Sequence, residues 1–221
     1  MPRAGRAGSR GEPEKTRAAI LQAALQEFAH EGVAGARTDE IARRAGVNKA
    51  LLYYYFKDKE GLYSAALEEV FSGLHARVIP VLDGKDLPPR KRLLQYIGAH
   101  FDYIAGHPVY PRMVQREFMR SVGRTLSPAA GRIFARYGRP IYAKLGSLVS
   151  EGVASGEFRK VDPGETIASI LGALNFYFIS LPAQQVLKPG DPTSPQRISA
   201  RRAALLDFVS AAVFHPSHLE K

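Results

Sequence analysis

The stretch TDEIARRAGVNKALLYYYFKDK, residues 38–59, decides the fold of the N-terminal part of this chain. Its first half predicts a short helix, because apolar residues recur there at helical spacing on one face: Ile41, Ala42 and Ala45. Thr38 is expected to cap the start of this helix, since a hydroxyl can accept a backbone N–H one turn on. Gly46 is expected to end it, because glycine tolerates the left-handed backbone of a tight exit.

A second short helix is predicted over residues 49–56. Asn48 can cap it, and Leu52 and Phe56, four positions apart, are expected to be buried. The remaining side chains of this helix are expected to be mostly free: Lys49, Ala50, Leu51, Tyr53, Tyr54 and Tyr55. Two helices joined by a short turn that contains glycine form the helix-turn-helix pattern, whose second helix enters the DNA major groove.

Many residues in and around this stretch stand in one characteristic order: Ala24, Leu25, Phe28, Glu31, Gly32, Thr38, Ile41, Ala42, Ala45, Gly46, Val47, Tyr53, Tyr55, Phe56, Lys59, Glu60 and Leu62. They resemble the TetR family of bacterial transcriptional regulators over about residues 15–65. The resemblance implies a DNA-binding head, a second domain that binds a small-molecule effector, and a dimer built on a four-helix bundle. It also implies repression as the commoner mode of action.

Composition and charge set limits on the class of protein. The chain has 221 residues and no cysteine, which excludes disulfides and thiolate chemistry. No apolar run approaches the roughly 18 residues that cross a bilayer, and no apolar core follows the basic N-terminus, so a cytoplasmic protein without a secretory signal is expected. The net charge of +10 favours an acidic partner such as nucleic acid. Residues 63–221 carry most of this excess, so charge does not locate the binding surface.

The chain is expected to be all-α, with a three-helix head and a larger helical regulatory and dimerisation domain. We expect a disordered arm over 1–12, a DNA-binding domain over 13–62 and a ligand-binding and dimerisation domain over 63–215. Arg3, Arg6 and Arg10 in the arm either reach a DNA backbone or minor groove, or form a solvated tail. About nine helices are predicted, over approximately 13–30, 38–45, 49–56, 59–82, 89–106, 110–122, 128–154, 165–181 and 198–213.

Two sets of residues in the head are expected to meet DNA. Base contacts are assigned to Lys49, Ala50 and Leu51, because lysine can donate to guanine and leucine can touch a thymine methyl. Phosphate contacts are assigned to Thr38, Asn48, Tyr53, Tyr54, Tyr55 and Lys59. The resemblance implies phosphate contact at the positions of Tyr53, Tyr55 and Lys59. In the alternative reading the tyrosines only wrap the small core, although three in succession cannot all be buried on one helix face.

The second domain holds weaker candidates. An effector pocket is expected among Phe101, Met113, Phe118, Tyr137 and Asn175, although aromatic and Met side chains at helical spacing are more often core. Asn175 lies in an apolar helix, so its amide needs either a backbone carbonyl or a ligand. Residues 112–144 carry eight basic side chains against the single acidic Glu117. An anionic effector or a solvated basic surface would both explain this, and the solvated surface is favoured.

Two apolar helices near the C-terminus indicate a homodimer, and the resemblance implies the same. The expected interface residues are Ile170, Leu174, Tyr177, Phe178, Leu205, Phe208, Val209 and Ala212. The alternative is that both helices only close the core of the monomer.

Catalysis finds little support in the sequence. The six histidines lack metal-ligand spacing, and there is no phosphate loop or nucleophile elbow. No enzyme activity, cofactor or metal is therefore expected. The sequence favours a sequence-specific DNA-binding regulator, a repressor released from a palindromic operator by an effector. The alternative is a helical ligand- or partner-binding dimer without specific DNA recognition.

Overall fold

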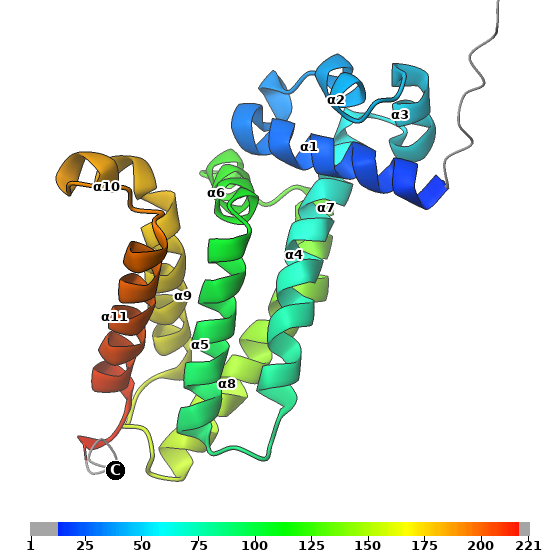
Figure 1. The fold of residues 1–221 in the computed structure, drawn as a ribbon. Helices are drawn as coiled ribbons and strands as arrows, with labels where there is room; N and C mark the ends of the chain where they lie inside the picture. Colours follow the sequence, from blue (N-terminus) through cyan, green and yellow to red (C-terminus); the bar gives the residue numbers. More distant parts are fainter. Residues whose placement is uncertain (1–12, 217–221) are drawn as a thin grey trace, which may run out of the picture. The chain divides into compact units, whose positions relative to one another are not determined.

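The computed structural model describes residues 13–216, and their regular secondary structure is helical apart from one isolated β-bridge between Phe158 and Phe214 (Figure 1). The all-α expectation is confirmed. The elements are α1 (Pro13–Gly35), α2 (Thr38–Arg44), α3 (Lys49–Phe56), α4 (Lys59–Asp83), α5 (Pro89–Gly106), α6 (Val109–Ser121), α7 (Pro128–Ile133), the π-helical segment η1 (Phe134–Gly138), α8 (Arg139–Ala154), α9 (Pro163–Ile179), α10 (Leu181–Leu187) and α11 (Pro195–Val213). The chain divides into two compact units between Leu67 and Glu68, within α4.

The first unit has its own small apolar core. It is formed by α1, α2, α3 and the first turns of α4, and its fully buried side chains are Ile20, Ala24, Phe28, Ile41, Leu52, Leu62 and Ala66. The Phe28 ring meets the Tyr63 ring edge-on at 5.2 Å. Gly32 interrupts α1 with a φ of 68°, close to the helix end expected near residue 30. The predicted three-helix head therefore forms around a core that each of its helices enters.

The second unit is a helical bundle in which α5, α8, α9 and α11 supply most of the buried apolar side chains. Helix α5 packs against α8, α9 and α11, and these run beside it in Figure 1. A bidentate ion pair joins α11 to α5, with Arg202 donating to Asp102 at 2.8 and 3.1 Å. Arg92 on α5, itself buried, donates to Glu151 on α8 at 2.7 Å.

Three details differ from the sequence expectation. The segment that follows residue 181, where no helix was predicted before residue 198, contains α10, which bends 67° away from α9. The single helix expected over 128–154 is continuous in the chain but contains the π-helical segment η1. Pro80, a residue type expected to end the helix predicted over 59–82, lies inside α4, which continues past it to Asp83.

No single described helix is long and apolar enough to cross a membrane, although α9 and α10 would reach that length and apolarity if taken as one bent pair.

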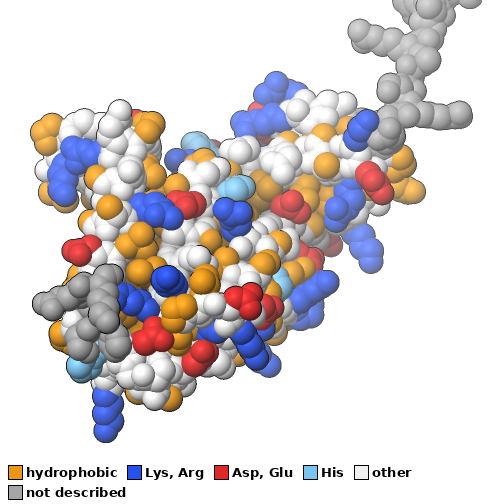
Figure 2. All heavy atoms as spheres, turned by 60° about the horizontal axis from the view of Figure 1, so that its bottom comes forward, with side chains coloured by type: hydrophobic (Ala, Val, Ile, Leu, Met, Phe, Trp, Pro, Cys, Tyr) orange, Lys and Arg blue, Asp and Glu red, His pale blue; other side chains and the backbone are white. Residues whose placement is uncertain are grey.

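Charges of both signs cover the surface shown in Figure 2, where Lys and Arg side chains alternate with Asp and Glu and with apolar side chains. The basic excess of the sequence therefore does not gather into one area on this face.

Candidate functional site

The turn between α2 and α3 is held by backbone and side-chain hydrogen bonds. Gly46 has a φ of 70°, as expected for a tight exit, and the Val47 N–H donates to the Ala42 carbonyl at 3.0 Å. The Asn48 side chain accepts the Leu51 N–H at 2.8 Å, which confirms the predicted cap of α3. Because Asn48 uses its amide oxygen in this cap, only its NH2 group is left for a phosphate.

Helix α3 is anchored on one side and open on the other. Leu52 and Phe56 are buried in the head core, as predicted. Lys49 and Ala50 are exposed at the start of the helix, whereas Leu51 is half-buried. The tyrosines differ: Tyr54 is 79 % exposed and Tyr53 37 %, while Tyr55 is half-buried with its ring edge-on to Tyr54 at 5.4 Å. The helix thus presents a lysine, an alanine and phenol groups to solvent.

Thr38 does not cap α2, contrary to expectation. Arg37 occupies the N-cap position without a side-chain hydrogen bond. Thr38 is buried, and its hydroxyl pairs with the Tyr53 hydroxyl at 3.2 Å. The physical reason is that the side chain faces α3, where a phenol offers a second hydroxyl. This contact joins the two helices of the motif and leaves Thr38 little surface for a phosphate.

Lys49, the predicted base-contacting residue, forms an ion pair that the sequence analysis missed. Its ammonium group lies 3.0 Å from the Asp39 carboxylate on α2, and both side chains remain largely exposed. The positive charge that would enter a groove is therefore shared with an acidic neighbour. The sequence contains the acidic partner, Asp39, ten residues before Lys49, but only the crossing of α2 and α3 brings the two charged groups together.

The link between α3 and α4 is strained and tight. Lys57 has a φ of 61° and a ψ of −60°, and the Asp58 N–H donates to the Phe56 carbonyl at 2.7 Å across it, which is the rare γ-turn. A Cβ on Gly61 would collide with the same carbonyl oxygen. Lys59 donates to the Ala34 carbonyl at 3.2 Å. The predicted phosphate donor Lys59 is thus tethered to the end of α1 at the exposed start of α4.

Acidic groups hold the arginines of α2 in place. Arg43 and then Arg44 donate to Glu40, and these hydrogen bonds lower the pKa of the Glu40 carboxyl to about 2. Glu27 is buried; one of its oxygens accepts the Arg37 N–H at 3.1 Å and the other lies 3.6 Å from Arg44. The two Glu27 contacts therefore join α1 to α2 and its N-cap, whereas the Glu40 pairs lie within α2.

The second unit contains a cavity of about 490 Å³ that opens to solvent, and its volume is within the range of small-molecule sites. Its lining residues come from α4, α5, α6, η1, α8 and α9: Phe71, Leu74, Tyr96, His100, Tyr110, Val114, Phe118, Phe134, Gly138, Arg139, Ile141, Tyr142, Leu171, Gly172, Asn175 and Ile179.

Two of the five predicted effector residues, Phe118 and Asn175, line this cavity, and three do not. Phe101 and Met113 are buried in the core elsewhere. The Tyr137 hydroxyl donates to Glu68 at 2.8 Å. Helical spacing identified the apolar faces of helices but could not tell which side chains border empty space. Tyr96 and His100, four apart on α5, were missed because the same spacing is equally typical of core.

Two polar groups in the cavity wall are incompletely paired. The Tyr96 hydroxyl lies 2.9 Å from His100 Nδ1, whereas the buried His100 Nε2 has no hydrogen-bond partner. Burial lowers the pKa of the His100 imidazole to about 3, so the ring is neutral near pH 7. Asn175 donates from its NH2 group to the Leu171 carbonyl at 2.9 Å, and its buried oxygen accepts nothing.

The basic stretch 112–144 is partly paired with α4. Arg136 lies 2.9 Å from Glu68, and Lys144 pairs with Asp83. Arg112, Arg124 and Arg132 are exposed. This arrangement fits the solvated surface favoured from the sequence.

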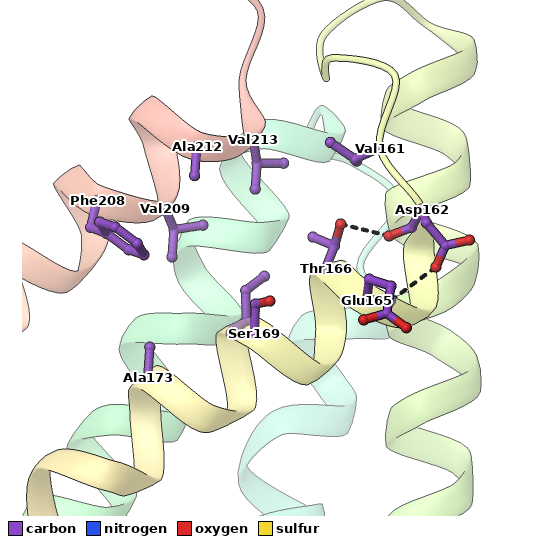
Figure 3. Close-up of a pocket in the computed structure, with 11 residues that line it drawn as sticks. Val161, Asp162, Glu165, Thr166, Ser169, Ala173, Phe208, Val209, Ala212 and Val213 are labelled. Atoms are coloured by element: carbon purple, nitrogen blue, oxygen red, sulfur yellow. Dashed lines mark hydrogen bonds between the residues drawn. The ribbon is translucent and has the colours of Figure 1, made fainter.

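Helices α9 and α11 border a shallow groove of about 290 Å³ (Figure 3). In this close-up, Phe208, Val209, Ala212 and Val213 of α11 lie across from Ser169 and Ala173 of α9. Exposed apolar rings flank this face, with Phe208 63 % and Phe176 69 % exposed.

Of the eight side chains predicted at the interface, six are buried within the single chain: Ile170, Leu174, Tyr177, Phe178, Leu205 and Val209. Ile170 and Val209 nevertheless line the groove. Only Phe208 is exposed, with Ala212 half-buried. When a helix is apolar on nearly all sides, its sequence does not show which side packs in the core of the monomer and which side faces a partner. Phe176, which the prediction omitted, offers more surface than any buried member of the set.

Among residues 13–216, no group of three or more His, Asp or Glu side chains is placed to hold a metal ion. The arginines of the expected arm, Arg3, Arg6 and Arg10, lie outside the described residues.

The head geometry defines a class: a helix-turn-helix protein whose second helix projects an exposed N-terminal end for the DNA major groove. Residues 20–66 match the family "Bacterial regulatory proteins, tetR family", and residues 89–209 match "Tetracyclin repressor-like, C-terminal domain". This chain belongs to the TetR family and is a DNA-binding transcriptional regulator.

Similar proteins agree with this assignment. The HTH-type transcriptional repressor SCO4008 of Streptomyces coelicolor is 32 % identical over 196 residues, which cover 87 % of this chain and 95 % of that protein. The putative transcriptional regulator SCO4942 of the same organism has a TM-score of 0.66 at 27 % identity, covering 90 % of this chain and 98 % of that one. The regulator FadR of Bacillus subtilis, solved with stearoyl-CoA, shares the fold with a TM-score of 0.66 at 20 % identity, covering 87 % and 96 %.

Proposed function

We propose that this regulator is a homodimeric repressor that binds a palindromic operator in the cytoplasm and leaves it when a small molecule fills the cavity of the second unit. In this proposal residues 13–62 bind DNA, and residues 63–215 bind the effector and form the dimer. The observation that carries the proposal is the structure of α3, which is anchored by Leu52 and Phe56 and leaves Lys49 and Ala50 exposed at its N-terminal end.

Base recognition is assigned to the start of α3. Lys49 would donate to guanine O6 or N7 after leaving Asp39, and Ala50 is small enough to let the helix lie deep in the groove. Leu51 is half-buried and offers only part of its side chain to a thymine methyl.

Phosphate contacts are assigned chiefly to the exposed tyrosines and to Lys59. Tyr53 and Tyr54 carry accessible phenol groups, and the Lys59 ammonium group is held at the start of α4 by the Ala34 carbonyl. Asn48 keeps its NH2 group for this role, whereas Thr38 acts through Tyr53. Such contacts position the protein without reading sequence.

Dimerisation is supported by the exposed face of α9 and α11 and by the two-fold symmetry of a palindromic DNA site. Two-fold proteins place two recognition helices on half-sites about one helical turn apart. Phe176 and Phe208 are large apolar side chains that a second copy would remove from water. The groove is also lined by the small residues Ala173 and Ala212, which permit close approach of a partner helix.

Effector control is supported by the position of the cavity along the chain. Phe71 and Leu74 on α4 line it, and the same helix begins at Lys59 next to the recognition helix in sequence. A ligand that pushes on these two side chains would shift α4 and thereby alter the spacing of the two recognition helices. The B. subtilis relative solved with stearoyl-CoA has the same fold and a bound small molecule.

The test measures, by fluorescence anisotropy, the affinity for a palindrome from the gene's own upstream region at a series of salt concentrations. Lys49→Ala is expected to cost about 1–3 kcal/mol on the specific site, and Lys59→Ala is expected to lower the salt slope by about 1. Lys85→Ala, an exposed lysine between α4 and α5, is the control. Unchanged affinity and slope in both Lys49→Ala and Lys59→Ala would contradict the assigned surface. Equal affinity for random DNA would favour a dimer without specific recognition.

A further inference from the structure

The cavity of the second unit is walled mainly by rings. Six aromatic side chains line it: Phe71, Tyr96, Tyr110, Phe118, Phe134 and Tyr142. The Phe134 ring lies 4.6 Å from that of Phe71 and 5.7 Å from that of Phe118. Walls of this kind favour a ligand with rings of its own, which can meet them in stacked or edge-on arrangements.

The hydrogen atoms of the Tyr96–His100 pair can be assigned by elimination. The Tyr96 hydroxyl is buried, and His100 Nδ1 is its hydrogen-bond partner at 2.9 Å. If the phenol did not donate there, its O–H would be buried without an acceptor, which is costly. The neutral imidazole must then carry its hydrogen on Nε2. His100 Nε2 is therefore a buried donor in the cavity wall without a protein acceptor.

Asn175 supplies the opposite kind of group. Its NH2 group is committed to the Leu171 carbonyl at 2.9 Å, which orients the amide and leaves the oxygen as a buried acceptor without a donor. Buried polar groups are normally paired by hydrogen bonds. Two unpaired groups in the wall of one cavity therefore indicate that a bound ligand supplies their hydrogen-bond partners.

The charges of the lining residues restrict the class of ligand further. Among the described lining residues, Arg139 is the one that carries a charge near pH 7, and it is exposed to solvent, whereas the His100 ring is neutral. Burying an ionised group against aromatic walls without a partner is strongly unfavourable. The interior therefore disfavours an ionic ligand.

Resting on the proposed role of this cavity as the effector site, we propose that its ligand is an uncharged, ring-containing molecule bearing hydroxyl groups, which pair with His100 Nε2 and Asn175 Oδ1. A hydroxyl group can accept a hydrogen bond from the imidazole N–H and can donate one to the amide oxygen, so hydroxyl groups can pair with both unpaired groups. A hydrocarbon serves neither, and a carboxylate can accept from His100 but cannot donate to Asn175.

Three probes with one ring system separate these cases: pyrene, 1-hydroxypyrene and 1-pyrenecarboxylate. Their fluorescence is titrated with the full-length protein in the absence of DNA. The hydroxylated probe is expected to bind about tenfold more tightly than pyrene, the value of one buried hydrogen bond, and the carboxylate no more tightly than pyrene.

Substitutions at the two unpaired groups locate the effect. Asn175→Leu keeps the approximate shape of the side chain and should reduce the preference for 1-hydroxypyrene over pyrene to about threefold or less, with pyrene affinity retained. His100→Phe should act in the same direction. Gln115→Leu, a matched polar-to-apolar change at an exposed position of α6 outside the cavity, should leave the preference intact. Thermal melts check that each variant is folded, and Asn175→Leu alone suffices should His100→Phe not fold.

Equal binding of pyrene and 1-hydroxypyrene, no saturable binding of either, a preference unchanged in Asn175→Leu, or tightest binding of the carboxylate would each overturn the ligand class. The role of the cavity in DNA release is judged separately, by adding 1-hydroxypyrene to the protein–DNA complex. A hydroxyl preference that depends on Asn175 without any effect on DNA affinity would support the ligand class and contradict the proposed release.

Discussion

The Lys49 ammonium group lies 3.0 Å from the Asp39 carboxylate and thereby joins the two helices of the DNA-binding motif. Both side chains are largely solvent-exposed, so the pair adds little to stability, on the order of 0–1 kcal/mol. In the proposed complex, Lys49 would exchange Asp39 for DNA, and the Asp39 carboxylate would then lie near the negatively charged DNA backbone. The acidic residue would thereby weaken binding.

Asp39→Asn is therefore expected to raise DNA affinity about two- to fivefold at low salt, because it removes both a competitor for Lys49 and a repulsive charge. Anisotropy titrations over a range of salt concentrations measure the change. Asp86→Asn, which makes the same charge change at an exposed site in the second unit, is the control. A loss of affinity in Asp39→Asn would mean that the carboxylate itself contacts the operator.

Gly61→Ala is expected to destabilise the first unit by about 1–3 kcal/mol, because a Cβ there would collide with the backbone carbonyl of Phe56. Backbone cannot move aside as a flexible side chain can, and the adjacent Lys57 is already strained. Denaturant unfolding followed by circular dichroism gives the magnitude. Gly131→Ala on α7 is the control, since nothing lies near its Cβ, and it should be neutral or slightly stabilising. Equal effects of the two changes would disprove the steric argument.

Stability is expected to fall as the pH decreases below about 6.5, because His100 is neutral in the fold with a pKa lowered to about 3 by burial. Between these two pH values the unfolded chain binds a proton that the folded chain does not, so the free energy of unfolding rises with pH. The slope from this group approaches about 1.4 kcal/mol per pH unit. Denaturant midpoints between pH 7 and 4.5 should show a shallower slope in His100→Phe than in the unsubstituted protein. Parallel curves would show that His100 is protonated in the fold.

Phe208→Glu is expected to convert the proposed dimer to a monomer, because it places a charge on the exposed α11 side chain that a partner would bury. Sedimentation velocity at micromolar concentration distinguishes the two states. Met119→Glu on α6 is a matched control, since Met119 is also 63 % exposed. A dimer that persists in Phe208→Glu would place the interface elsewhere.

Helix positions were largely predictable because they depend on local chemistry. Pro89 begins α5, Gly46 ends α2 and Asn48 caps α3, and each acts within one turn of its own position. Helix α10 was not predicted, because Pro182 and the Gly- and Pro-rich segment after it are typical of a loop, yet proline is tolerated in the first turn of this helix.

The sequence by itself determined the all-α fold, the helix-turn-helix head and the exposed start of α3, because helical spacing, caps and turn residues operate over a few neighbouring positions. Only the tertiary structure decided that Asp39 forms an ion pair with Lys49, and that Thr38 forms a hydrogen bond with Tyr53 instead of capping its own helix. It alone also decided that His100 and Asn175 border a cavity. These relationships depend on how helices cross. A periodic pattern records which side of a helix is apolar, but it does not record whether another side chain, a partner or empty space lies opposite.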